Sequence, residues 1–130
     1  MKKYWIILIF TLSISAEIHL IATQGCPFNV IDKKTVKKLF MRKSLHYKET
    51  PIIVLDNRDY YNEFIQTYIK KNPTKMNIYW TRMIFTGTRK PPKKISEKEL
   101  QNMITPQNSC LLSYTLSKTI KGWKNIHVTP

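Results

Sequence analysis

Two stripes of apolar side chains in the middle of the chain constrain its fold more than any other feature of the sequence. The first stripe recurs at helical spacing and consists of Tyr61, Phe64, Ile65, Tyr68 and Ile69. Side chains at this spacing lie on one face of an α-helix, and that face must be buried against another layer. The stripe stops before Asn72-Pro73. The pattern therefore predicts an amphipathic helix over residues 61–69.

A second stripe follows at once and repeats the same spacing. It consists of Met76, Tyr79, Trp80, Met83 and Ile84. We expect these side chains to lie in the core, and Gly87 is suited to end the helix in the left-handed conformation. The basic residues that follow surround two prolines, so we expect them to form a stiff, solvated loop. They are Arg89, Lys90, Lys93 and Lys94.

Short apolar segments on either side of the stripes have the composition of buried strands. They are residues 17–22, 52–55, 109–116 and 125–128. Two more helices carry N-terminal capping signals: Asp32 precedes one, and Ser96 with Glu99 forms a capping box for another that carries Met103 and Ile104. Helices that alternate with short strands indicate an α/β protein. We predict a three-layer sandwich in which a small mixed β-sheet is flanked by helices.

The N-terminus has the pattern of a cleavable secretory signal. Two lysines precede an uncharged run from Tyr4 to Ser15, and small residues stand before Glu17. The run is shorter than the roughly 20 apolar residues that span a membrane. A retained anchor, or a lipoprotein modified at Cys26, is the alternative. We predict a signal peptide over residues 1–16, a single domain over 17–130, and a periplasmic or secreted protein that is not an integral membrane protein after cleavage.

If the chain is exported, its two cysteines are expected to form a disulfide. Cys26 and Cys110 are the only cysteines of the chain, and a lone pair in an oxidising compartment is more often a disulfide than a metal site. Two unrelated buried thiols are the alternative. The sequence favours a disulfide.

Catalytic and metal-binding patterns are not found in the sequence. The three histidines, His19, His46 and His127, are scattered, and neither HExxH nor GxSxG occurs. We therefore predict no enzyme, no catalytic residues, no metal site and no cofactor.

The charge of the chain is strongly positive. It has 22 Lys and Arg against 8 Asp and Glu, a formal net charge of +14. The lysines cluster at residues 33–38, 70–75, 89–94 and 118–124. Such clusters are either an ordinary solvated surface or an attraction for anions: a phosphate-like solute, an acidic lipid or polymer, or an acidic partner. Nucleic acid is not expected, because the chain carries export signals and no nucleic-acid module.

A block within the second stripe resembles a known family. It comprises Tyr79-Trp80, Arg82, Phe85-Thr86-Gly87 and Pro91-Pro92, and Tyr114 stands at the end of the later strand. This block is similar to one in the small single-domain relatives of phosphate ABC transporter substrate-binding proteins, which have the type 2 periplasmic-binding-protein-like fold. The resemblance extends over about residues 17–128. It implies a domain like one lobe of a type 2 periplasmic binding protein.

The resemblance also implies a function. It suggests an exported substrate-binding module for phosphate or a related oxyanion, held at helix N-termini and by an arginine. The ligand-binding residues it implies are Thr23, Asn29, Arg58 and Ser96. The family's Ser-Gly-Thr segment is replaced by residues 56–61, which contain two aspartates, and a glycine of the later strand is replaced by Ser113. We therefore expect a reduced or degenerate site.

The alternative is a non-enzymatic periplasmic interaction module that docks an acidic or membrane partner, such as an envelope protein, through its basic face.

Overall fold

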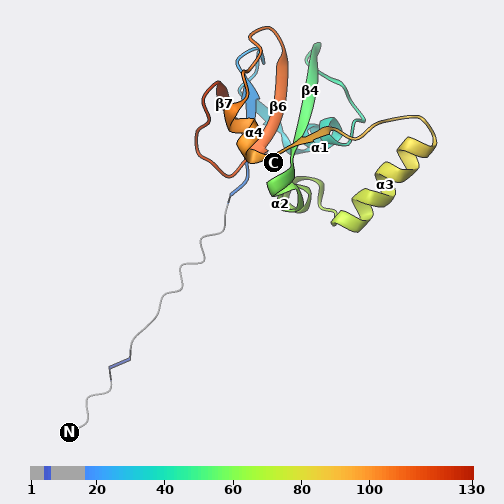
Figure 1. Cartoon of the computed structure of the whole chain (residues 1–130), viewed down its shortest axis with the longest axis horizontal. Coiled ribbons are helices and arrows are strands. Elements are labelled where there is room, and N and C mark those ends of the chain that lie inside the picture. Colours follow the sequence, from blue (N-terminus) through green and yellow to red (C-terminus); the bar gives the residue numbers. More distant parts are fainter. Residues whose placement is uncertain (1–4, 7–16) are drawn as a thin grey trace.

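The computed structural model describes residues 5–6 and 17–130, and residues 17–130 form a mixed α/β fold around one seven-stranded sheet (Figure 1). The signal-peptide prediction falls almost entirely outside these residues and stays a prediction. The strands are β1 (His19–Thr23), β2 (Val30–Asp32), β3 (His46–Tyr47), β4 (Thr50–Asn57), β5 (Lys93–Ile95), β6 (Cys110–Thr115) and β7 (Trp123–Thr129). The helices are α1 (Lys33–Phe40), α2 (Tyr61–Phe64), α3 (Pro73–Phe85) and α4 (Glu97–Asn102). A 3₁₀ turn (Arg58–Tyr60) precedes α2, and a π-helical turn (Ile65–Ile69) follows it.

The sheet is mixed, as predicted. Its strand order is β2-β7-β1-β6-β4-β3, and β5 pairs with the second half of β4. β4 runs parallel to β6 and β5, β2 runs parallel to β7, and β1 is antiparallel to both of its neighbours. The carboxyl ends of β4, β5 and β6 therefore meet at one end of the sheet.

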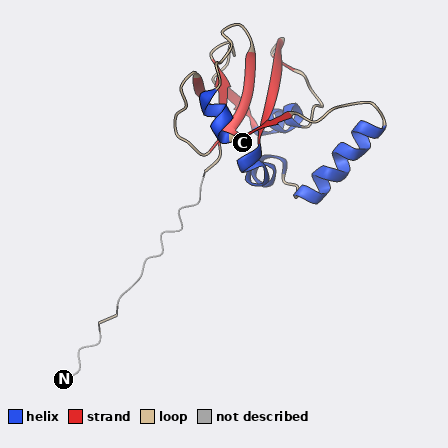
Figure 2. Ribbon diagram, viewed as in Figure 1, coloured by secondary structure: helices blue, strands red, loops and turns tan. Residues whose placement is uncertain are grey.

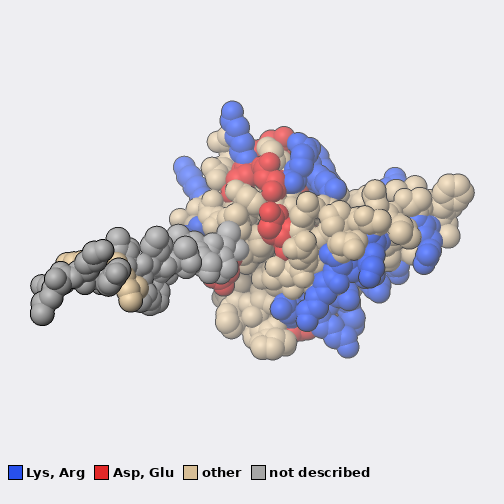
Figure 3. All heavy atoms as spheres, turned by 90° about the horizontal axis from the view of Figure 1, so that it is seen from below, with Lys and Arg blue, Asp and Glu red and all other residues tan. Residues whose placement is uncertain are grey.

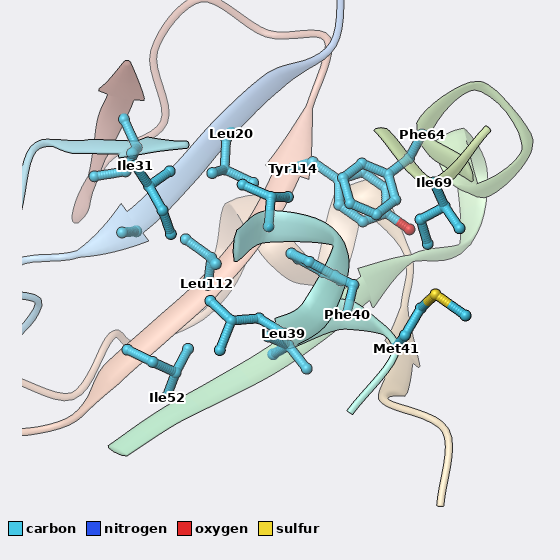
Figure 4. Close-up of a cluster of buried hydrophobic side chains, with 14 of the residues drawn as sticks. Leu20, Ile31, Leu39, Phe40, Met41, Ile52, Phe64, Ile69, Leu112 and Tyr114 are labelled. Carbon is cyan, nitrogen blue, oxygen red and sulfur yellow. The ribbon is translucent and has the colours of Figure 1, made fainter. Parts of the chain in front are cut away.

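Helices cover both faces of the sheet (Figure 2). On one face α1 and α2 bury their apolar sides against β1, β4 and β6. There the rings of Phe64 and Tyr114 stack with their centroids 3.8 Å apart, and the Phe40 ring packs beside both (Figure 4). On the other face Leu100 of α4 packs with Leu111 and Trp123. Neighbouring strand residues point to opposite faces, so the longer strands β1, β4, β6 and β7 each contribute to both clusters.

The predicted disulfide is confirmed. Cys26 and Cys110 are bonded, with their Cα atoms 4.5 Å apart and a separation of 84 positions in the sequence. The bond joins the loop after β1 to the first residue of β6. It therefore ties two neighbouring strands in the middle of the sheet to each other.

The two helical stripes and the later capped helix are confirmed, with three corrections. Residues 65–69 of the first stripe form a π-helical turn that ends at Lys70 in the left-handed conformation, although Phe64, Ile65 and Ile69 are buried as expected. In the second stripe Ile84 is exposed, because the last turn of α3 extends beyond the surface that Met76 and Trp80 contact. Helix α4 ends at Asn102, so the prediction that it carries Met103 and Ile104 is wrong.

Three short strands were not predicted. β2, β3 and β5 have two or three residues each, and each pairs with the edge of a longer strand. Lys93 and Lys94 belong to β5, so the basic connector that was predicted as a loop ends as a strand.

Candidate functional site

Thr23 is fully buried and has a structural role. Its hydroxyl Oγ1 donates to the carbonyl oxygen of Ser109 at 2.8 Å and accepts from the amide of Leu111 at 3.0 Å. These bonds hold β1 against β6 beside the disulfide. The only hydrogen of the hydroxyl is thus already donated to the protein, and the side chain is not exposed to solvent, so Thr23 has no donor to offer a ligand.

The other three residues that the sequence suggested lie in two separate places. Asn29 is exposed at the edge of the sheet, where its carbonyl oxygen accepts from the amide of His127 at 2.9 Å. Arg58 and Ser96 follow β4 and β5 at the carboxyl end of those strands. β7, β1 and β6 lie between β2 and β4. The structure thus brings Arg58 and Ser96 together and separates them from Asn29 and Thr23.

The cap formed by Ser96 is already occupied by groups of the protein. Ser96 Oγ accepts from the Glu99 amide at 3.1 Å, which confirms the predicted cap. The Asp59 carboxylate accepts from the Glu97 amide at 2.8 Å. An anion at this helix end would displace a carboxylate that the chain itself supplies.

This end of the sheet is also acidic. The Glu97 carboxylate accepts from the Asn57 side chain at 2.6 Å and from the Ser117 hydroxyl at 3.2 Å. Burial raises the pKa of Tyr60, and the negative charges of Glu97, Asp59 and Glu63 raise it further. A field of this sign repels an oxyanion.

A cleft of about 530 Å³ lies beside this acidic end, between α3 and the loop that follows it. Its walls include Trp80, Pro92, Tyr61 and Lys94, and Asp56 contributes a carboxyl group. Lys94 Nζ lies 3.9 Å from the centroid of the Tyr61 ring. Tyr114 donates its hydroxyl to Asp56 Oδ1 at 2.9 Å. Burial raises the pKa of Asp56 to about 7, although the Tyr114 hydrogen bond and the charge of Lys94 lower it.

A second hollow, of about 580 Å³, has the opposite character. We call it the basic groove, and it is lined by Arg42, Lys43, Leu45, Ile84, Gly87, Thr88, Arg89 and Lys90. None of the eight acidic residues lines it. Four of its eight lining residues are cationic, so its charge suits an anion.

Two sharp turns build the basic groove. After α1, Arg42 takes a left-handed conformation (φ 59°), and the amides of Arg42 and Lys43 bond back to carbonyls of Leu39 and Lys38. After α3, Gly87 takes the left-handed conformation (φ 67°) that the sequence predicted, and the Thr88 amide bonds back to Met83. Each turn sends two basic side chains into the same space. Arg42 and Arg89 are half-buried, and the Arg89 guanidinium contacts Met83 Sδ at 3.5 Å.

The positive charge continues beyond the basic groove. Burial lowers the pKa of Lys71, and the charges of Lys37, Lys43 and Lys75 lower it further. These lysines together with the basic groove form what we call the basic face. Lys and Arg side chains gather toward the α3 side of the molecule, whereas acidic side chains gather nearer its middle (Figure 3).

Half of the basic groove could be anticipated from the sequence. The run 89–94 is a basic cluster in the sequence, but Arg42 and Lys43 lie far earlier in the chain and belong to none of the lysine clusters described above. The two pairs come together because α3 contacts the residue that follows α1, where the Tyr79 hydroxyl donates to the Met41 carbonyl oxygen at 2.8 Å.

Comparison with protein-family models and with curated protein sequences finds no match for this chain. Within residues 5–6 and 17–130, no group of three His, Cys, Asp or Glu side chains could hold a metal ion. No helix of the described part is long and apolar enough to cross a membrane.

Proposed function

We propose that the chain is an exported, non-enzymatic binding module for phosphate or a related oxyanion, and that the basic groove supplies the contacts. One observation carries this proposal. Four cationic side chains from two distant turns, Arg42 with Lys43 and Arg89 with Lys90, converge on one hollow that no acidic residue lines. Side chains of like charge repel, so their convergence is explained best by an anion that binds between them.

The chemistry of the basic groove suits an oxyanion. A guanidinium group offers several N–H donors in a plane that matches two oxygens of a phosphate, and partial burial limits the freedom of Arg42 and Arg89. The volume of about 580 Å³ is in the range of small-molecule sites and leaves room for a substituent on the anion. The contacts differ from those that the resemblance implied, so this is an altered site.

The fold is consistent with a lobe of a type 2 periplasmic binding protein, and we include that assignment in the proposal. The block that carries the resemblance forms α3, the Gly87 turn and the loop that borders both hollows. Placement in the periplasm or outside the cell is supported by the disulfide and by the signal-like N-terminus.

Thermal unfolding in the presence of anions tests the proposal. Phosphate or sulfate at 10 mM should raise the Tm of the purified chain above its value in sodium chloride of equal ionic strength, because a ligand that binds only the folded state stabilises it. The double variant Arg42→Ala/Arg89→Ala should lose the increase. The control Lys98→Ala/Lys121→Ala removes the same charge from exposed positions outside the basic groove and should keep it. Equal Tm values in phosphate and chloride would refute the proposal.

A second candidate function is docking of an acidic envelope protein. The observation that favours it is the extent of the basic face, since Lys37, Lys71 and Lys75 lie outside the basic groove. Such docking requires the lysines beyond the groove, whereas oxyanion binding does not. Capture of an acidic protein from envelope extract that survives Arg42→Ala/Arg89→Ala but is lost in Lys71→Glu/Lys75→Glu would select this function.

A further inference from the structure

Large apolar side chains are exposed beside the basic groove. Phe85, the last residue of α3, is 91% exposed, Ile84 is 57% exposed and Leu45 is 47% exposed. Ile84 and Leu45 line the basic groove itself, between the cationic side chains. An exposed apolar cluster rimmed by charged residues marks an interaction site on a soluble domain.

Helix α3 is placed so that this cluster can reach a partner. It stands away from the sheet, and its C-terminal end lies at the extremity of the described domain (Figure 1). Met76 and Trp80 are its buried residues, and Ile78 lies on the outer side of the helix with Phe85, seven residues later. The outer side of α3 therefore has no protein layer over it within the described residues.

We propose that the end of α3 and the basic groove together dock on an anionic lipid surface. Phe85, Ile84 and Leu45 would enter the boundary between headgroups and acyl chains. Arg42, Lys43, Arg89 and Lys90 would contact lipid phosphates. This inference rests on the proposed function, since it identifies the oxyanion of the basic groove as a phosphate that belongs to a lipid headgroup.

Charge complementarity selects the lipid surface as the partner. A second copy of the chain would present the same cluster of cations, and the two clusters would repel each other. A small soluble anion would explain the cations but would leave Phe85 in water. An anionic membrane explains both, because basic side chains are attracted to its surface and neighbouring apolar side chains enter its interface.

Flotation of residues 17–130, the chain expected after signal cleavage, with vesicles tests the inference. The chain should float with vesicles of phosphatidylcholine and phosphatidylglycerol at three to one, and not with phosphatidylcholine alone. Phe85→Ser should lower the partition coefficient roughly tenfold. Ile104→Ser is the matched control, because Ile104 is 94% exposed but follows α4, away from the basic groove. Arg42→Ala/Arg89→Ala should lower it roughly twenty-fivefold, since each basic residue contributes about fivefold.

The outcomes separate this inference from the proposed function. Absence of flotation with anionic vesicles, equal flotation with neutral ones, or an unchanged partition of Phe85→Ser would each overturn docking. If docking fails while phosphate still raises the Tm, the basic groove is a site for a soluble oxyanion. If flotation is lost on Phe85→Ser while phosphate leaves the Tm unchanged, the basic groove binds phosphate groups only on a lipid surface, and the proposed binding of a small soluble oxyanion fails.

Discussion

The carboxyl group of Asp56 is buried near the end of the apolar strand β4. Its side chain is 4% exposed, and its partner Tyr114 is itself buried beneath Phe64. Burial raises its pKa to about 7, so near neutral pH the group is present in both protonation states. In the unfolded chain the same carboxyl has a pKa close to 3.8. The folded state therefore binds this proton more tightly than the unfolded state does.

The stability of the chain should consequently fall as the pH rises from about 4 to about 7. The contribution of the Asp56 proton is fully present below the pKa of the unfolded chain and is lost as the pH passes the pKa of the folded chain, a change of about 4 kcal/mol at most. Asp56→Asn should be more stable than the wild type at pH 8 and should show a weaker pH dependence, because its amide oxygen can still accept from Tyr114. Urea unfolding at pH 5 and pH 8 measures both quantities. An Asn variant whose stability falls with pH as steeply as that of the wild type would contradict the assignment.

Gly25 and Gly87 are needed for different reasons, and an alanine at each position tests them: Gly25 has no room for a side chain, whereas Gly87 has a left-handed backbone conformation. A Cβ atom on Gly25 would lie 2.5 Å from the carbonyl oxygen of Ser109, beside the disulfide. A Cβ atom on Gly87 would meet nothing within 4 Å, although its φ of +67° disfavours a side chain. We expect Gly25→Ala to lower the free energy of unfolding by about 3 kcal/mol and Gly87→Ala by about 1 kcal/mol. Urea titration of both variants gives the order, and a reversed order would contradict the packing of the loop after β1.

The disulfide is the strongest single constraint between elements. In the chain-entropy description, a bond that closes a loop of this length contributes about 4 to 5 kcal/mol, as an upper estimate. The variant Cys26→Ala/Cys110→Ala should lose a large part of that stability. Urea unfolding of the oxidised wild type, the reduced wild type and the variant measures it. Equal stability of oxidised and reduced protein would show that Thr23 and the strand pairing alone hold β1 to β6.

Elements whose signals are local were predictable from the sequence. The caps at Asp32 and Ser96 and the stop at Gly87 depend on residues within one helical turn, and the structure has all three. β2, β3 and β5 were missed because each is too short to show a period of its own and forms only where a distant strand offers an edge. The π-helical turn after α2 keeps the same apolar stripe as an α-helix, so the pattern could not distinguish them.

Site residues were the least predictable part. Thr23, Asn29, Arg58 and Ser96 were inferred from a resemblance to proteins that hold an oxyanion, and that inference took no account of distance in space. The structure assigns Thr23 to the strand pairing beside the disulfide and Ser96 to a cap. Arg42 and Arg89 come together where α3 contacts the residue that follows α1, which is a property of the whole fold.

Across the whole molecule, acidic and basic side chains gather in different places: the acidic ones at the carboxyl end of β4 and the basic ones on the basic face. At the carboxyl end of β4, burial raises the pKa of Tyr60 and the charges of Glu97, Asp59 and Glu63 raise it further. On the basic face, burial lowers the pKa of Lys71 and the charges of Lys37, Lys43 and Lys75 lower it further. An uneven distribution of this kind orients the molecule toward an anionic partner and accelerates encounter at low salt. It also has a structural cost, because the lysines of the basic face repel one another.

Because the lysines of the basic face repel one another, replacing one of them by a neutral residue should stabilise the fold. Since the pKa of Lys71 is lowered, its charged form is disfavoured in the folded state, and removal of the charge should stabilise the fold. Lys71→Gln should be more stable than the wild type by about 0.5 kcal/mol in 20 mM salt, and the difference should shrink in 1 M salt because the repulsion is screened. Urea unfolding at the two salt concentrations checks this. A Lys71→Gln variant that is less stable at low salt would contradict the repulsion.

The central claim is that the basic groove is the anion site of this chain. Titration of the isotope-labelled protein with phosphate, followed by amide chemical shifts in two-dimensional NMR, tests it most directly. The account predicts saturable shifts that centre on residues 42–45 and 87–90 and are absent in Arg42→Ala/Arg89→Ala. Shifts that centre instead on Thr23, Asn29, Arg58 and Ser96, or no saturable shifts at all, would contradict it.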